Sequence, residues 1–167
     1  MGTSIREIAQ GVISTVIGGL LLSSAFFFIN DVFFSTPDLN GMWEVEVEIT
    51  ETEFANFKNL KLIFIVMIEQ NGNNLFGTAE KHSEESPLGK KIIFKGKSRI
   101  ISSIKGHITN KYFLSDTASA HFTEKGLLRD STVIQSLAIH SNRKMSGKFY
   151  SSVAQSGGKV LWVKKSI

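Results

Sequence analysis

The segment MWEVEVEIT, residues 42–50, alternates large apolar side chains with glutamates without a break. Successive side chains of a strand point to opposite faces, so the apolar residues fall on one face and the glutamates on the other. The apolar face consists of Trp43, Val45, Val47 and Ile49. This period of two predicts a strand with one buried and one solvated face, and it favours a β-rich fold for the chain that follows.

The period of two continues toward the C-terminus. LKLIFIVMIEQ, residues 60–70, is rich in β-branched and aromatic residues, and the Asn-Gly of NGNN, residues 71–74, is a strong hairpin signal. Further strands are predicted at 75–82, 97–105, 109–115, 131–139, 145–153 and 159–165, with 90–94 and 118–122 as possible short additions and 83–91 as a loop.

About eight sequential strands joined by short turns favour an all-β, eight-stranded antiparallel up-and-down barrel, because closure removes the exposed sheet edges. A β-sandwich is the alternative. Side chains either fill the interior of such a barrel or line it around one small ligand. Small polar residues occur on both faces of RIISSIK (99–105) and STVIQSLAI (131–139), so a polar cavity and a solvent face both remain open.

GVISTVIGGLLLSSAFFFIN, residues 11–30, contains no charged residue. About 20 apolar residues span the hydrocarbon core of a bilayer, and the polar face expected of a soluble helix is missing here. We predict a flank over 1–7, a permanent transmembrane helix over 8–34, a linker over 35–40 and the barrel over 41–167. The alternatives are a signal peptide cleaved near Ser23-Ser24-Ala25 and a buried core helix.

Small residues recur along the predicted helix, mostly at intervals of four. They are Gly11, Thr15, Gly18, Gly19 and Ser23. Such stripes let helix backbones approach closely within a membrane. We therefore expect helix packing through these residues and a homo-oligomer.

Basic residues are concentrated after the predicted helix. Residues 86–115 contain seven lysines and arginines and no acid. This composition favours anionic partners such as phosphates, nucleotides or acidic lipid headgroups, and a solvated basic face has the same composition. Near the N-terminus, Arg6 beside Glu7 is a weak positive-inside signal that places the barrel outside the cytoplasm.

No catalytic or metal-binding motif is present in the sequence. The chain has no cysteine, and its four histidines show neither HExxH nor His-x-His spacing. The phosphate loops GxxxxGK[ST] and GxGxxG are missing, and no nucleophile elbow is recognisable. We expect no catalytic residue, no metal ion and no cofactor.

LNGMWEVEVEI, residues 39–49, resembles the Gly-x-Trp start of lipocalin-type barrels, with Gly41 and Trp43 at the matching positions. This resemblance implies structural roles for both, with the tryptophan closing the base of a lipocalin-like barrel. A short N-terminal membrane anchor followed directly by a small β-barrel resembles the membrane-anchored, CD-NTase-associated effectors of bacterial CBASS anti-phage systems. That second resemblance covers the whole chain in architecture rather than in residue motifs.

The CBASS resemblance implies that the barrel binds a cyclic dinucleotide, which a CD-NTase makes on infection. Binding would drive oligomerisation and disrupt the inner membrane, killing the infected cell. These effectors usually have two transmembrane helices, whereas one span is found here, and their barrel is cytosolic, against the signal of Arg6. We expect a single-pass protein of the bacterial inner membrane with a cytosolic barrel and no direct contact with nucleic acid.

The candidate ligand-binding residues follow from side-chain chemistry. Arg99 and Lys105 suit phosphate contacts, Tyr112 and Tyr150 suit stacking on bases, and Gln135 suits a base edge. Ser103 is a further candidate. For each, a surface or core role is the alternative. A different class of function is a membrane-tethered, lipocalin-like barrel that holds a lipid.

Overall fold

The computed structural model describes residues 5–33, 36–96, 100–111, 114–124 and 130–166. The chain divides into two compact units, Met1–Ser35 and Thr36–Ile167.

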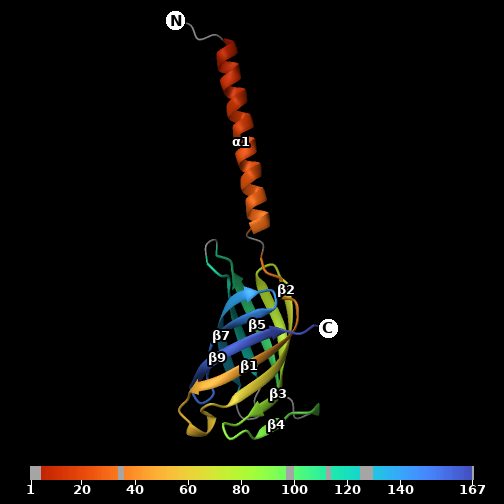
Figure 1. Ribbon diagram of the computed structural model, residues 1–167, viewed down its shortest axis with the longest axis vertical. Helices are drawn as coiled ribbons and strands as arrows, with labels where there is room; N and C mark the ends of the chain where they lie inside the picture. The colour runs from red at the N-terminus through yellow and green to blue at the C-terminus, as the bar shows by residue number, and fades with distance from the viewer. Residues whose placement is uncertain (1–4, 34–35, 97–99, 112–113, 125–129, 167) are drawn as a thin grey trace. The chain divides into compact units, whose positions relative to one another are not determined.

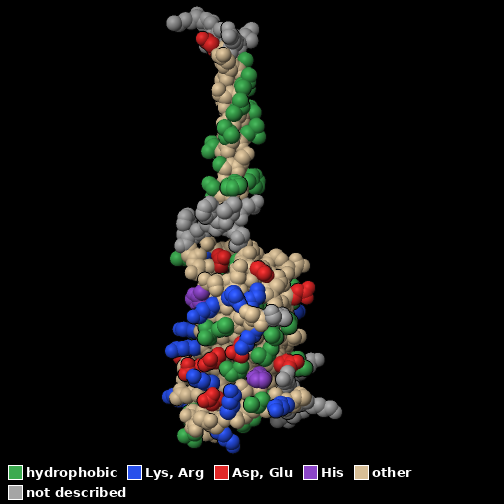
Figure 2. All heavy atoms as spheres, turned by 45° about the vertical axis from the view of Figure 1, so that its right-hand side comes forward, with side chains coloured by type: hydrophobic (Ala, Val, Ile, Leu, Met, Phe, Trp, Pro, Cys, Tyr) green, Lys and Arg blue, Asp and Glu red, His purple; other side chains and the backbone are tan. Residues whose placement is uncertain are grey.

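The first unit holds one helix, α1 (Ile5–Phe33). Its segment Glu7–Ile29 has a mean hydropathy of 2.2, and none of it is buried. At about 1.5 Å per residue these 23 residues extend for roughly 35 Å, more than the thickness of a hydrocarbon core. On the face shown in Figure 2, hydrophobic side chains follow the described helix along its length. By length and composition, α1 is able to cross a membrane.

The second unit is a closed barrel of eight antiparallel strands in the described part of the chain (Figure 1). The strands are β1 (Gly41–Glu51), β2 (Lys61–Asn71), β3 (Asn74–Glu85), β5 (Ile101–Thr109), β6 (Thr117–Glu124), β7 (Ser131–Ser141), β8 (Lys144–Ser151) and β9 (Ser156–Lys164). Each pairs with the next, and β1 pairs with β9 to close the sheet. The up-and-down barrel is confirmed, and the sandwich alternative is wrong.

Two short elements are not among the eight strands of the barrel. The three-residue β4 (Lys91–Ile93) pairs with the end of β3, and a 3-10 turn, η1 (Ala55–Phe57), lies between β1 and β2. The loop predicted at 83–91 is shorter than expected, because β3 continues to Glu85 to pair with both β2 and β4.

The strand predicted at 109–115 is wrong. Thr109 is the last residue of β5, and the other described residues of that range belong to no strand. The backbone N–H of Lys111 donates to Asp116 Oδ1 over 2.8 Å. The backbone carbonyl of Asp116 accepts from the N–H of Ile139, also over 2.8 Å. The strand that replaces it is β6, which covers the short segment predicted at 118–122 and extends it at both ends.

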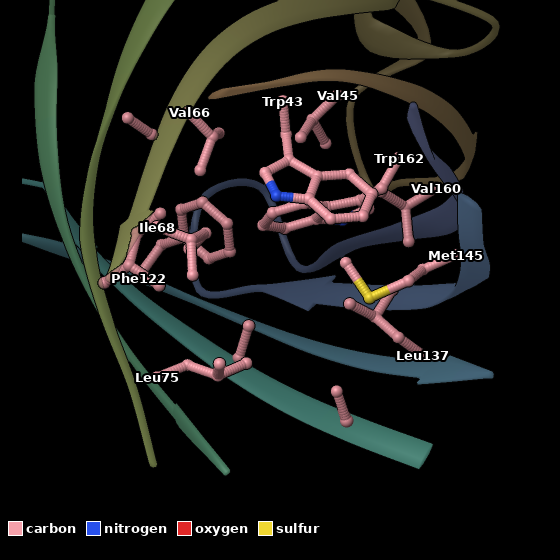
Figure 3. Packing of buried hydrophobic residues seen from close by; sticks show 14 of the residues in the cluster. Trp43, Val45, Val66, Ile68, Leu75, Phe122, Leu137, Met145, Val160 and Trp162 are labelled. Carbon is pink, nitrogen blue, oxygen red and sulfur yellow. The ribbon is translucent and has the colours of Figure 1, made fainter. Parts of the chain in front are cut away.

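The core of the barrel follows from the alternation of its strands. Every second residue of β1 points inward, and Trp43 and Val45 are fully buried. Trp162 lies beside them on the neighbouring strand β9, and Phe122 of β6 packs against Trp162 (Figure 3). The ring centroids of Trp43 and Trp162 lie 6.0 Å apart in an edge-to-face arrangement, which aromatic pairs prefer.

One end of the barrel is closed by the segment that enters β1. Leu39 is fully buried, and its carbonyl accepts a hydrogen bond from Trp43 Nε1 over 2.9 Å. The amide of Gln70, near the end of β2, accepts from Leu39 N–H over 2.7 Å and donates to the carbonyl of Pro37 over 3.0 Å. Gly41 has a φ of +114°, a conformation that favours glycine, and it turns the chain into β1.

Candidate functional site

A cavity occupies the end of the barrel opposite Leu39, where β1 ends, β2 begins, β8 ends and β9 begins. Its volume is about 200 Å³. Most of the described residues that line it are apolar, and the polar ones are Lys81, Glu84, Ser102, Glu124, Ser131, Gln135, Ser151 and Ser156. A concave, mostly apolar site with a few polar groups is typical of small-molecule binding.

Three polar side chains form a row across the inner wall near the mouth. Glu124 of β6 is paired in register with Ser102 of β5 on one side and with Ser131 of β7 on the other. Among the described residues, none of these three side chains has a hydrogen-bond or ion-pair partner. Burial raises the pKa of the Glu124 carboxyl above its ordinary value of 4.5, and the positive charge of Lys81 opposes that rise.

Lys81 is the one cation among the described residues that line the cavity. Its Nζ lies 2.6 Å from Glu84 Oε2 and 4.7 Å from the centroid of the Phe94 ring. The two charged side chains are largely buried, with 17% and 25% exposed. The positive charge of Lys81 is therefore already paired within the chain.

Gln135 is located deeper in the cavity. It is 3% exposed, and its Oε1 accepts a hydrogen bond from Trp162 Nε1 over 2.8 Å. Trp162 in turn packs against Trp43 and, with ring centroids 6.1 Å apart, against Phe122. This contact links the cavity to the aromatic floor of the barrel.

The structure separates the four predicted ligand residues that it describes. Gln135 lines the cavity, whereas Ser103 and Lys105 are exposed on the outer wall of β5. Tyr150, 66% exposed, lies on the outer wall of β8. Arg99 and Tyr112 lie outside the described residues. Ser103 and Lys105 share a shallow outer depression with His107 and His121, and Tyr150 lies outside that group.

The outer wall of the barrel is divided by charge. The described outward-facing positions of β5 to β8 carry hydroxyls, histidines and three lysines, but no acid; the lysines are Lys105, Lys144 and Lys148. Those of β1 to β3 carry Lys61 and several glutamates, among them Glu44, Glu46, Glu48, Glu69, Glu80 and Glu85. Glu44 pairs with Lys165 over 2.8 Å, and Glu46 pairs with Lys61 over 3.6 Å. One side of the barrel is therefore basic and the other acidic.

The residues predicted to pack membrane helices all lie on α1. No atom outside the helix lies within 4 Å of the Cβ positions of Gly11, Gly18 and Gly19, and the Thr15 hydroxyl donates to the Gly11 carbonyl over 2.9 Å. This bond satisfies the threonine hydroxyl within its own helix, as a hydroxyl in lipid requires. Ser23 is exposed as well.

Gly41 and Trp43 lie at the closed end of the barrel, as the lipocalin-type resemblance implies, and neither lines the cavity. Among the described residues there is no group of three or more histidine, aspartate or glutamate side chains placed to hold a metal ion.

The sequence analysis did not identify the polar row or the Lys81–Glu84 pair. The row draws Ser102, Glu124 and Ser131 from three strands, and they become neighbours only through the register of those strands. A charged residue at an inward position of an alternating strand was the available signal: in TASAHFTE (117–124), Glu124 continues the inward series of Ala118, Ala120 and Phe122.

No protein family matches the sequence, and no curated protein sequence matches it. Among solved structures, the chain is similar to a redesigned β-barrel at 15% sequence identity and a TM-score of 0.49. That similarity covers 77% of this chain and 92% of the redesigned one, and it concerns the fold alone.

Proposed function

We propose that this protein is a membrane-anchored receptor, in which α1 is held in a bilayer and the barrel binds a small ligand. The observation that carries the proposal is the difference between the two ends of the barrel. One end is sealed by Leu39 and two indoles, and the other opens on a cavity of about 200 Å³. A cavity with one entrance and a packed floor gives a ligand a defined depth and orientation.

The cavity wall favours a ligand with a substantial apolar body. Phe64, Phe122 and Phe149 line the cavity, and apolar surface buried against them contributes about 25 cal/mol per Å². A ligand with several charges would lose its hydration against the same walls without gaining enough partners. A lipid-like amphiphile is the class that this wall supports best, which makes the protein a membrane-tethered, lipocalin-like lipid-binding barrel.

The second candidate is the CBASS-type effector, with a cyclic dinucleotide made by a CD-NTase as its ligand. Three features support it: Phe57 at the mouth offers an aromatic ring to a base, Gln135 offers an amide to a base edge, and residues 86–115 are basic. In this form, ligand binding triggers oligomerisation and disruption of the bacterial inner membrane, as an abortive-infection defence. The barrel is then cytosolic and the protein single-pass.

We propose that the protein is a homo-oligomer in either form. The small-residue stripe of α1 supports close helix packing. The basic wall of β5 to β8 and the acidic wall of β1 to β3 support contacts between the barrels of neighbouring copies, because the two surfaces are complementary in charge.

The test uses the full chain purified in detergent, with ligands identified by native mass spectrometry and binding measured by thermal shift. Val133 faces the cavity, and the next residue, Ile134, faces outward. Val133→Phe therefore fills the cavity, and Ile134→Phe is the matched control with the same added ring on the outer wall.

We expect a ligand that raises the melting temperature of the wild type and of Ile134→Phe, but not that of Val133→Phe. A lipid-like ligand supports the lipid-binding barrel, and a cyclic dinucleotide supports the effector. An equal response of Val133→Phe and the wild type would refute binding in the cavity. A panel of amphiphiles and cyclic dinucleotides that shifts nothing would refute the receptor itself.

A further inference from the structure

The polar row at the mouth of the cavity is poor in donors. Glu124 presents a carboxyl group between the hydroxyls of Ser102 and Ser131, and none of the three has a side-chain partner in the described part of the chain. An ionised carboxylate accepts hydrogen bonds and donates none, whereas a hydroxyl does both. The two hydroxyls are the only donors of the row, and in the described part of the chain neither donates to the carboxylate, which is therefore open to a donor on a ligand.

Lys81 does not supply that group. Its ammonium lies 2.6 Å from Glu84 Oε2, so its charge is compensated by the carboxylate three residues further along the same strand. The described charged groups that line the cavity are Lys81, Glu84 and Glu124, with a formal sum of one negative charge. The negative charge that remains belongs to Glu124.

We infer that the cavity selects amphiphiles whose polar end donates hydrogen bonds, a primary amine above all and a hydroxyl next, over those that end in a carboxylate or a phosphate. This inference rests on the proposed binding of ligands in the cavity and adds the chemistry of the polar end. An ammonium forms a charge-assisted bond with Glu124, and such bonds are about twice as strong as neutral ones. The serine hydroxyls on either side then accept its remaining hydrogens.

The same geometry disfavours an anionic end group. A carboxylate or phosphate placed on the row would meet the like charge of Glu124 in a half-buried site, where charges are only partly screened. It could be accommodated only if Glu124 took up a proton, or if Lys81 gave up its bond to Glu84. Both changes cost binding energy. Burial of this carboxylate also raises its pKa, and the positive charge of Lys81 opposes that rise.

The experiment compares three probes that share one eight-carbon chain: octylamine, octanol and octanoate. The full chain is held in phosphatidylcholine nanodiscs, and binding is measured by isothermal titration calorimetry after subtraction of empty nanodiscs. Glu124→Gln keeps the size of the side chain and removes its charge. Glu48→Gln makes the same change on the outer wall of β1 and is the matched control. Val133→Phe fills the cavity, so any binding that it retains takes place outside the cavity.

We expect octylamine to bind the wild type and Glu48→Gln about tenfold or more tightly than octanoate, with octanol between them. In Glu124→Gln the preference for the amine should fall to within about threefold, because the amide presents no charge. Octanoate binding as tightly as the amine, or an amine preference that survives in Glu124→Gln, would overturn the inference while leaving the receptor intact. Loss of all three probes, or equal binding by Val133→Phe, would instead refute the cavity as a binding site.

Discussion

The bond between Gln135 and Trp162 gives a quantitative test of how the cavity is joined to the floor of the barrel. Gln135→Met removes the acceptor and leaves the buried Nε1–H of Trp162 without a partner, which costs about 1–3 kcal/mol. Trp162→Phe removes the donor and weakens two aromatic contacts, each worth about 0.5–1.5 kcal/mol. Either single variant should therefore lower the free energy of unfolding.

The two losses should not add. In the double variant no unpaired N–H remains, so its cost should fall below the sum of the single costs by about 1–2 kcal/mol. The assay is urea unfolding of the full chain in detergent, followed by far-UV circular dichroism and extrapolated to zero urea. Ser136→Met, on the outer wall beside Gln135, is the matched control and should change the free energy of unfolding by less than about 0.5 kcal/mol.

Additive costs, to within about 0.5 kcal/mol, would refute the coupling between Gln135 and Trp162. A neutral Gln135→Met would refute it in a different way, because it would mean that the indole N–H needs no acceptor. With the coupling present, the amide of Gln135 is oriented by Trp162. Its Nε2 and the second lone pair of its Oε1 are then left to contact a ligand.

Three further predictions follow from other parts of the barrel. Leu39→Ala removes a fully buried side chain from the closed end and should lower the free energy of unfolding by about 2–5 kcal/mol in the same urea assay; a change below about 1 kcal/mol would mean that the end is not packed. Because burial raises the pKa of Glu124, the folded state binds its proton more tightly than the unfolded state, so the melting temperature should fall as the pH rises from 4.5 through the raised pKa. Glu124→Gln should remove that part of the pH dependence, and an unchanged profile would contradict it. Lys148→Glu on the basic wall and Glu48→Lys on the acidic wall should each weaken self-association in analytical ultracentrifugation at low salt, and an equimolar mixture should restore it; no rescue would rule out pairing of the two walls.

The barrel could be predicted from the sequence because apolar and polar residues alternate clearly in strands whose inward side chains are large. In β1 the inward series of tryptophan, valine and isoleucine leaves no doubt about which face is buried. The Asn-Gly between β2 and β3 marks the hairpin that sets their pairing. Strands of similar length, each joined to the next, then favour closure, since an open sheet would expose two edges.

The error at β6 has a physical cause. Its inward residues include Ala118 and Ala120, whose small side chains give a weak hydrophobic signal, whereas the segment KYFL just before it carries large apolar residues. Burial in the barrel is decided by pairing with β5 and β7 on either side, and not by side-chain size alone.

The cavity-lining face could not be assigned from the sequence. In RIISSIK (99–105) polar and apolar residues occur on both faces, and the pairing of β5 with β6 decides that Ser102 and Ile104 point inward while Ser103 and Lys105 point outward. Gln135 was named as a ligand residue because its amide suits a base edge, and the structure places it in the cavity. Glu124 could not be assigned to a site from the sequence, because its neighbours Ser102 and Ser131 lie on other strands.

The cavity arises from the way side-chain size is distributed along the barrel axis. Toward the closed end the inward positions hold Trp43, Trp162 and Met145, which fill the interior. Toward the mouth, corresponding inward positions hold serines, such as Ser102 and Ser131, and a serine occupies far less space than an indole. Hydroxyls that leave space also leave hydrogen-bonding groups facing it. The serines that leave room for the cavity therefore also determine which chemical groups a ligand must present to it.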